Sequence, residues 1–437
     1  MSRASDRLLG RARARWHRLA SVVRTALSTD GDVAGDRRAA DGAEAAELAR
    51  TAGRMRGGLA KVAQLRAYLE LEDGLGPEAR AQLTTLWDRV PPDPPQAIRQ
   101  VVEADLGAPI AALFAAWDDA PIAAASLGQV HAARLADGTE VAVKVQYPGI
   151  AAALDDDLAS PAVLRQLIGP GIGDGAERGA LDTLRAAIAR ELDYVAERAA
   201  LERFGRAFFG DATIRLPRPI ADRSSARVLT MTRLPGVPLR AFAAAADPAA
   251  RAAVARTLLR FALGAPLRHG VVNGDPHPGN YLVDAAAPAG QVGFVDFGFV
   301  VELDALAAID RRLWLAMVHR DGEALRYAAH QEGLVPRVGV FDHAAWRDFE
   351  RALGGPFLAR GARVYGTADA AALAAAFARL IHGGALRLAP EAVVLWRQRI
   401  GFFSVLGSLG ASLELRKILC EVLDDDRHPT PLYERYP

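Results

Sequence analysis

The fold prediction starts from Asn273-Gly-Asp275-Pro-His277-Pro-Gly-Asn280, which precedes a second short motif, Asp296-Phe297-Gly298. The first motif is rich in Gly and Pro, so it is expected to be a loop. Short β-prone pieces at 281–283 and 292–295 lie between the two motifs and predict strands. The sequence therefore places an Asp, an Asn and a second Asp on polar loops beside short apolar strands.

These polar groups fit the requirements of phosphoryl transfer. That reaction needs a carboxylate beside the nucleophile and oxygen ligands that hold Mg²⁺ against nucleotide phosphates. An Asp and an Asn separated by four residues, followed by a strand that ends in Asp-Phe-Gly, form the arrangement of protein kinases. In this arrangement Asp275 is the catalytic-loop carboxylate, and Asn280 and Asp296 bind Mg²⁺. His277 lies between two prolines, with no second His or Cys placed to form a metal site, and is expected to shape the loop.

A predicted hairpin precedes these loops. Segments 130–134 and 140–146 are β-prone and are separated by Asp137-Gly138, a typical hairpin turn. Lys144, in the second strand, either contacts nucleotide phosphates or extends its ammonium to solvent from an edge strand. Glu191 and Glu197 are alternative partners for this lysine, on a helix predicted over 181–208, and their helical phases differ too much for a shared role.

Small residues precede the hairpin, where a kinase has its glycine-rich phosphate loop. They include Ala123, Ala124, Ala125 and Ser126. Alanine lets backbone amides approach a phosphate almost as closely as glycine does, but it adopts a positive φ only at a cost. We therefore expect a nucleotide-binding loop that is stiffer than a glycine-rich one.

Composition limits the class of protein. The chain has 437 residues, of which 51% are hydrophobic, and a net charge of +1, so it lacks the broad basic surface that non-specific nucleic-acid binding requires. Its single cysteine, Cys420, cannot form an internal disulfide, which fits a reducing cytosol. Cys420 is expected to be a small buried hydrophobe. No window of about 18 residues is free of charge, so no transmembrane helix is expected.

The N-terminal segment is basic and amphipathic if it is helical. Apolar residues from Leu8 to Leu27 then form one stripe, with arginines beside or opposite it. Residues 7–27 could then lie on an anionic membrane surface as a peripheral contact, pack on their own domain, or form a frayed basic tail. The polar stretch 28–42 is predicted to be a linker.

Taken together, the motifs resemble the UbiB/AarF family of atypical protein-kinase-like proteins. The resemblance runs from Arg54 to Val301 and rests on Lys61-Val-Ala-Gln64, AAASLGQVH, VAVKVQYPGI, ELDYVAE, GDPHPGN and DFG. It implies an α+β, two-lobed protein-kinase-like fold that binds ATP or ADP with Mg²⁺. The expected segments are a basic N-terminal part (1–42), a helical extension (43–117), an N-lobe (118–235) and a C-lobe (236–437).

The resemblance also implies a role for individual residues. Lys144 is the phosphate-contacting lysine and Glu197 its helix partner, while Met231 lies at the interlobe hinge against adenine. The small-residue loop over 123–126 completes the nucleotide site. Glu191 and Asp193 correspond to the ExD pair of the family, which accompanies the extension helix with Lys61 and Gln64. In the family that helix covers the side of the cleft where a protein kinase accepts its polypeptide substrate.

Several positions depart from the family pattern. Ala63 replaces a glycine, Asn273-Gly274 replaces His-Ala, Ala200 replaces an asparagine, and Thr232 stands where an acid is common. The resemblance implies an ATP- and Mg²⁺-dependent kinase or ATPase in lipid or isoprenoid quinone metabolism. The alternatives are a nucleotide-binding regulatory pseudokinase and, if the motif order is accidental, a helical scaffold.

Overall fold

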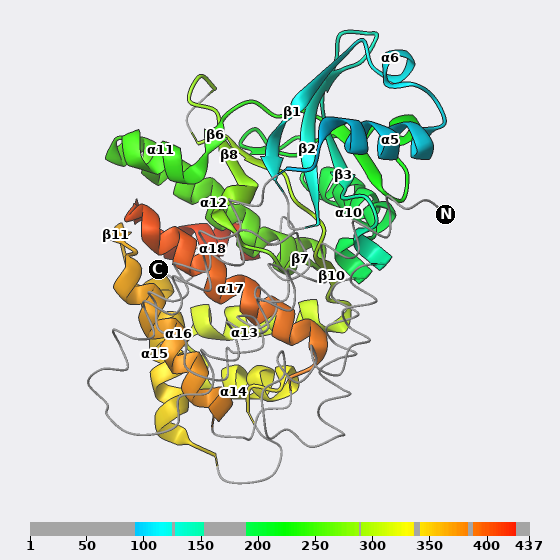
Figure 1. Cartoon of the computed structure of the whole chain (residues 1–437). Coiled ribbons are helices and arrows are strands. Elements are labelled where there is room, and N and C mark those ends of the chain that lie inside the picture. Colours follow the sequence, from blue (N-terminus) through cyan, green and yellow to red (C-terminus); the bar gives the residue numbers. More distant parts are fainter. Residues whose placement is uncertain are drawn as a thin grey trace, which may run out of the picture. The chain divides into compact units, whose positions relative to one another are not determined.

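The computed structural model describes residues 92–124, 127–152, 189–287, 290–335, 341–382 and 388–424. Its elements fall into two units (Figure 1). The first, here called the sheet unit, ends at Ala196 and resumes over Pro219–Arg233. The second, the helical unit, takes Glu197–Arg218 and continues from Leu234. The four-segment division expected from the sequence remains a prediction.

The sheet unit is built on a four-stranded antiparallel sheet in the order β1-β2-β3-β5. Its strands are β1 (Ala116–Ala124), β2 (Gly128–Arg134), β3 (Glu140–Gln146) and β5 (Val228–Thr232). Leu135 N donates to Thr139 O between β2 and β3, and Gly138 has a φ of 88°, which glycine adopts without strain. The predicted hairpin with its Asp137-Gly138 turn is therefore confirmed.

Strand β1 corrects one sequence expectation. Ala123 and Ala124 were placed in a loop, but they pair with Val130 and Gln129 of β2 at the end of β1. The pairing register shifts on both sides of Pro121, a residue that a sheet accepts on an edge strand because it has no N–H to donate. Pro121 and the small side chains around it hid this strand from pattern analysis.

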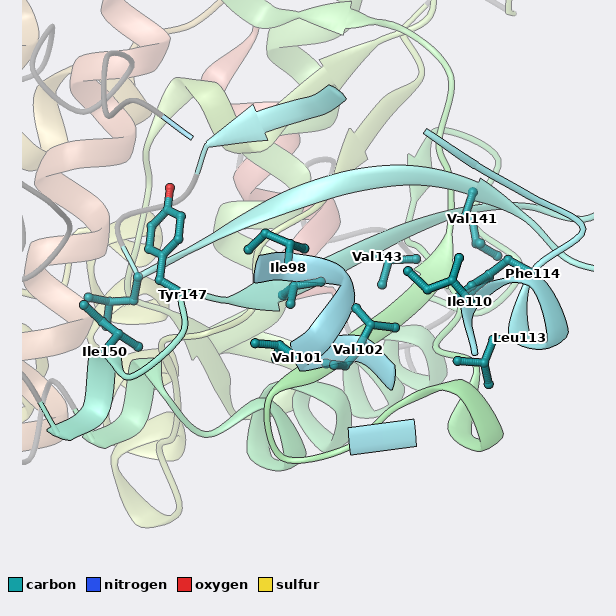
Figure 2. Close-up of a cluster of buried hydrophobic side chains, with 14 residues drawn as sticks. Ile98, Val101, Val102, Ile110, Leu113, Phe114, Val141, Val143, Tyr147 and Ile150 are labelled. Atoms are coloured by element: carbon teal, nitrogen blue, oxygen red, sulfur yellow. The ribbon is translucent and has the colours of Figure 1, made fainter. Parts of the chain in front are cut away.

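One helix covers the sheet and closes a hydrophobic core. Helix α5 (Pro95–Leu106) has Pro at its first position and ends at Gly107, whose φ is 72°. It buries Ile98, Val101 and Val102, spaced as one helical face, and packs against β3 and β5. Figure 2 shows these side chains together with those of β3, of the short helix α6 (Ile110–Leu113) and of the residues after β3: Val141, Val143, Ile110, Leu113, Phe114, Tyr147 and Ile150.

The predicted helix over 181–208 is wrong as one continuous element. Residues 192–193 are not helical, and helix α10 (Tyr194–Ala207) starts after them. The Asp193 carboxylate accepts a hydrogen bond from Ala196 N at 2.9 Å, as a helix N-cap does. Glu191 and Glu197 therefore do not lie on the same helix, and the argument from their helical phase does not apply.

Most of the helices among the described residues lie in the helical unit. They are α11 (Leu239–Ala245), α12 (Pro248–His269), α13 (Ala305–His319), α14 (Gly322–Glu332), α15 (His343–Leu358), α16 (Thr367–His382), α17 (Pro390–Leu409) and α18 (Leu415–Leu423). Figure 1 shows α13 to α18 in yellow to red. The prediction of a mostly helical chain after Pro248 is confirmed.

Short strands organise the part of this unit that carries the polar motifs. One sheet has the order β4-β9-β8-β6, and two others pair β10 with β7 and β11 with β12. The strands are β4 (Ile214–Arg215), β6 (Val237–Pro238), β7 (Val271–Asn273), β8 (Tyr281–Val283), β9 (Val292–Phe294), β10 (Val300–Glu302), β11 (Arg363–Val364) and β12 (Ser412–Leu413). Strands β8 and β9 were predicted. All eight strands are two or three residues long, too short to show a hydrophobic period.

Within the described residues, no helix combines the length and apolarity needed to cross a bilayer. Cys420 is fully buried on α18, as expected for a small hydrophobe.

Candidate active site

Strand pairing in the helical unit brings the two polar motifs to one place. Strand β7 pairs with β10, so that Asn273 is opposite Val300, and β8 pairs with β9, so that Tyr281 is opposite Phe294. The loop between β7 and β8 contains Asp275, and the loop between β9 and β10 contains Asp296. These loops are called here the carboxylate loop (274–280) and the DFG loop (295–299). Because both pairs of flanking strands are bonded, the two loops lie beside each other.

Asp275 and Asn280 are in direct contact. Asn280 Nδ2 donates to Asp275 Oδ2 at 3.1 Å, across one turn of 3₁₀ helix, η2 (Pro278–Asn280). The His277 ring accepts from Gly279 N at 3.1 Å and so shapes this turn, as expected. Since the nitrogen of the Asn280 amide is bonded to Asp275, its oxygen is the atom suited to bind a cation.

The Asn273 side chain connects the carboxylate loop to the DFG loop. Asn273 Nδ2 donates to the backbone oxygen of Asp296 at 2.7 Å, and Asn273 Oδ1 accepts from Asp275 N at 3.1 Å. Sequence analysis noted Asn273 only as a departure from the family pattern and gave it no role. Its position directly before the catalytic Asp was the feature that could have drawn attention to it.

The DFG motif packs on helix α10. Phe297 is buried, with its ring centroid 4.8 Å from that of Phe204. Asp296 Oδ1 accepts from Gly298 N at 3.0 Å. A Cβ built on Gly298 would lie 3.4 Å from Asp296 Oδ1 and 3.6 Å from Glu197 Oε2, so the buried Glu197 carboxylate lies beside this loop.

Helix α17 packs against the carboxylate loop. A Cβ on Gly401 would lie only 2.5 Å from Pro276 Cγ, so α17 and the loop are in close contact there. A Cβ on Gly274 would lie 2.6 Å from the Phe299 ring and 2.7 Å from Val394 Cγ1. Alanine, the residue of the family pattern at 274, therefore does not fit this packing, which accounts for the glycine. This role of α17 was not predicted from the sequence.

Lys144 lies in the sheet unit, in the middle of β3 between Val130 of β2 and Leu229 of β5. It is therefore on an inner strand, which argues against the edge-strand alternative. Its ammonium nitrogen is 5.2 Å from the ring centroid of Tyr194, a cation–π distance. A Cβ on Gly128 would lie 2.9 Å from the Tyr194 hydroxyl oxygen. Tyr194 is part of the ELDYVAE motif, but sequence analysis assigned it no role.

The end of the AAASLGQVH motif forms a buried polar network. Gln129 Oε1 accepts from Asp93 N at 2.9 Å, and Gln129 Nε2 lies 2.8 Å from His131 Nε2. His131 Nδ1 lies 2.8 Å from the Asp118 carbonyl oxygen, so Nδ1 donates and Nε2 accepts from Gln129. Burial lowers the pKa of His131. These side chains therefore attach the segment before α5 to the sheet.

The remaining predicted site residues stay predictions. Met231 is buried in β5, where it pairs with Ala142 and forms a bridge with Pro219. Lys144 belongs to the sheet unit and Glu197 to the helical unit, so their pairing stays a prediction. Four predicted residues lie outside the described part of the chain: Lys61, Gln64, Ala125 and Ser126.

The donor atoms of the two loops fit Mg²⁺ better than they fit a metal held entirely by protein. Among the described residues, no group of three or more His, Cys, Asp or Glu side chains could hold a metal ion. Mg²⁺ bound with a nucleotide commonly takes only one or two carboxylates, with phosphates and waters as its other ligands. The Asn280 amide oxygen and the Asp296 carboxylate are suited to such a site.

Comparison with known proteins identifies the family. The family model described as the ABC1 atypical kinase-like domain matches residues 85–329, more than half of the chain. Atypical kinase COQ8B from Rattus norvegicus is 29% identical over 388 residues, covering 86% of this chain and 71% of the relative. The probable protein kinase UbiB from Pseudomonas putida is 33% identical, covering 62% of this chain and 51% of the relative.

Other relatives match over less of their own length. ACTIVITY OF BC1 COMPLEX KINASE 7 from Arabidopsis thaliana is 34% identical over 225 residues, covering 51% of this chain but only 32% of the relative. The chain thus matches about a third of that protein. Among solved structures, the complex of Rv3197 with erythromycin from Mycobacterium tuberculosis has a TM-score of 0.62 and 25% identity, covering 86% of this chain and 93% of that one.

The fold is α+β and protein-kinase-like. The chain belongs to the ABC1 atypical kinase-like family, the group that includes proteins named UbiB and COQ8B. The family prediction made from the sequence is confirmed.

Proposed function

We propose that this chain binds ATP or ADP with Mg²⁺ and transfers the terminal phosphoryl group of ATP to an acceptor or to water. The observation that carries the proposal is the contact between Asn280 and Asp275, on a loop that the Asn273 side chain joins to the backbone of Asp296. A carboxylate beside an amide and a second carboxylate is the donor set that phosphoryl transfer uses.

Each residue has a proposed role. Asp275 orients the attacking hydroxyl or water and accepts its proton, and Asn280 holds that carboxylate by its Nδ2–H. Asn280 and Asp296 would hold Mg²⁺, which neutralises charge on the phosphate oxygens when bound. Lys144 binds phosphate oxygens, Glu197 is its proposed partner, and Met231 is proposed to contact adenine. Ala123 to Ser126 are proposed to approach the phosphates through their backbone amides.

Magnesium-dependent nucleotide binding and turnover test this proposal. Mg-ATP at millimolar concentration should raise the melting temperature of the full chain, because a ligand that binds only the folded state stabilises it. Asp275→Asn should keep this shift and lose most of the turnover, whereas Asp296→Asn should lose most of the shift as well. A well-folded wild-type chain whose melting temperature Mg-ATP leaves unchanged would contradict the proposal.

The same experiment separates the enzyme from the alternative function. A regulatory pseudokinase would show the thermal shift without turnover, in the wild type as in Asp275→Asn. The expected acceptor is a small molecule or lipid rather than a protein, in the context of lipid or isoprenoid quinone metabolism. This expectation rests on the family resemblance alone, and efficient phosphorylation of generic peptides by the intact chain would overturn it.

Peripheral membrane contact through residues 7–27 is a separate proposal. The segment lies outside the described residues, and its support is the apolar stripe bordered by arginines. Each basic residue near an anionic surface contributes about 1 kcal/mol, which salt weakens. The full chain should co-sediment with anionic liposomes at low salt, and a chain that starts near Asp30 should not. Equal binding by both would show that this segment is not the anchor.

A further inference from the structure

The Asn273 side chain bonds to residues of both polar loops. Next to it, Gly274 N donates to Phe299 O at 2.8 Å, where the β7–β10 pairing ends. At the other end of the loops, Val295 N donates to Asn280 O at 3.1 Å, next to the β8–β9 pairing. Asp275 and Asp296 lie on the two loops between these backbone bonds. The Asn273 side chain is hydrogen-bonded to the backbone of both residues.

Both bonds of Asn273 end on the backbone of a residue with a proposed role in the reaction. Its Nδ2–H reaches the Asp296 carbonyl oxygen, and its Oδ1 receives the Asp275 N–H. A side-chain amide can donate and accept at the same time without any change of charge. No other side chain forms both of these bonds among the hydrogen bonds of the described loops.

We propose that Asn273 is a positioning residue that holds the Asp275 and Asp296 backbones in a fixed relation. The role rests on the proposed function, because it matters for the reaction only if these two carboxylates act on one nucleotide.

Two substitutions test the two bonds. Asn273→Ala removes both, whereas Asn273→Asp keeps the acceptor for Asp275 N–H but loses the donor. Gln291→Ala is a matched control, because the Gln291 amide also donates to a backbone oxygen of the helical unit, Ala212 O at 3.0 Å, away from both loops.

Hydrogen exchange of the chain without ligands tests the connection itself. Asn273→Ala should raise exchange in peptides covering both 274–280 and 295–299, while Asn273→Asp should raise it mainly in 295–299 and less in 274–280. Gln291→Ala should change neither loop. Unchanged exchange in both loops of Asn273→Ala would overturn the proposal, regardless of whether the chain binds or turns over nucleotides.

Kinetics then test the consequence for turnover. Asn273→Ala should lower kcat about tenfold or more with KM for Mg-ATP changed less than about threefold, because misplaced groups affect the transition state more than nucleotide binding. Wild-type kcat in Asn273→Ala would overturn the role, whereas an inactive wild type would count against the proposed function alone.

Discussion

Tyr194 supports Lys144 at the scale of a single residue. Its buried ring lies 5.2 Å from the ammonium nitrogen, and such contacts contribute about 0.5–2 kcal/mol. Tyr194→Leu should therefore weaken Mg-ATP binding severalfold, because the lysine is less well held. Calorimetric titration measures this Kd.

Tyr194→Phe is the matched control for that substitution. It keeps the ring and removes only the hydroxyl that lies near Gly128, so its Kd should stay close to that of the wild type. If both variants bind Mg-ATP as the wild type does, the ring does not position Lys144.

His131 makes the stability of the sheet unit sensitive to acid. Burial lowers its pKa, so below the ordinary value of about 6.5 the unfolded chain takes up a proton that the folded chain resists. The contribution of His131 to stability is fully present above that pH and decreases as the pH is lowered through it. His131→Gln keeps one donor and one acceptor without titrating. Between pH 7 and pH 5, its melting temperature should fall less than that of the wild type. Parallel curves would assign the acid sensitivity to other groups.

Single residues show what the sequence could and could not predict. Asp275, Asn280 and Asp296 were placed on adjoining loops because their types and spacing carry the chemistry. Asn273 and Tyr194 were missed because their roles consist of contacts with residues distant in sequence, which no local pattern reports. Gly274 was recorded only as a departure, since its reason lies in the positions of Phe299 and Val394.

At the scale of elements, α17 determines where the carboxylate loop lies. Gly401→Ala would place a Cβ 2.5 Å from Pro276 Cγ, so the loop or the helix has to shift. We expect kcat to fall about tenfold or more, since small misplacements of reacting groups are costly. Gly355→Ala on α15 is the control: apart from its chain neighbours, nothing lies within 4 Å of its added Cβ. It should keep activity, and because Pro356 follows it, we expect no gain in helix stability. Equal activities for the two variants would rule out support by α17.

Elements with a regular period were predictable from the sequence, and interrupted ones were not. The β2–β3 hairpin has strong alternation and a typical turn, and α5 and α12 have clear ends. Strand β1 was missed because Pro121 and two register shifts break its pattern. The break before α10 was missed because Asp193 acts as an N-cap, although it lies within a stretch of good helix-forming composition.

At the scale of the whole molecule, a buried charged cluster joins three helices of the helical unit. Arg399 of α17 bonds to Asp310 of α13 and lies 4.0 Å from Glu332 of α14, with its guanidinium over the ring of Trp396. Glu332 also accepts from Trp396 Nε1 at 2.7 Å. Burial, together with the nearby Asp310 charge, raises the pKa of Glu332 to about 8.

This pKa predicts how stability depends on pH. Between about 4.3, the ordinary value for Glu, and 8, the unfolded chain releases a proton that folded Glu332 keeps. The contribution of Glu332 to stability is therefore greatest at acid pH and is lost as the pH rises to 8. Glu332→Gln keeps an acceptor for Trp396 and removes the ionisation. Its melting temperature should match the wild type near pH 5 and exceed it by about 2 °C or more at pH 8. A lower melting temperature at pH 8 would show that Glu332 is ionised in the folded chain.

The division of the sequence between the two units has a consequence for synthesis on the ribosome. The sheet unit needs β5, which pairs with β3, so its sheet stays incomplete until residues 228–232 have left the exit tunnel. Strand β4 pairs with β9 and therefore waits for residues 292–294 while the chain between them is still being translated. Each unit thus exposes an unpaired strand edge during elongation, a state prone to aggregation. We expect the yield of folded protein in cells to depend on translation speed and chaperone supply more than its final stability suggests.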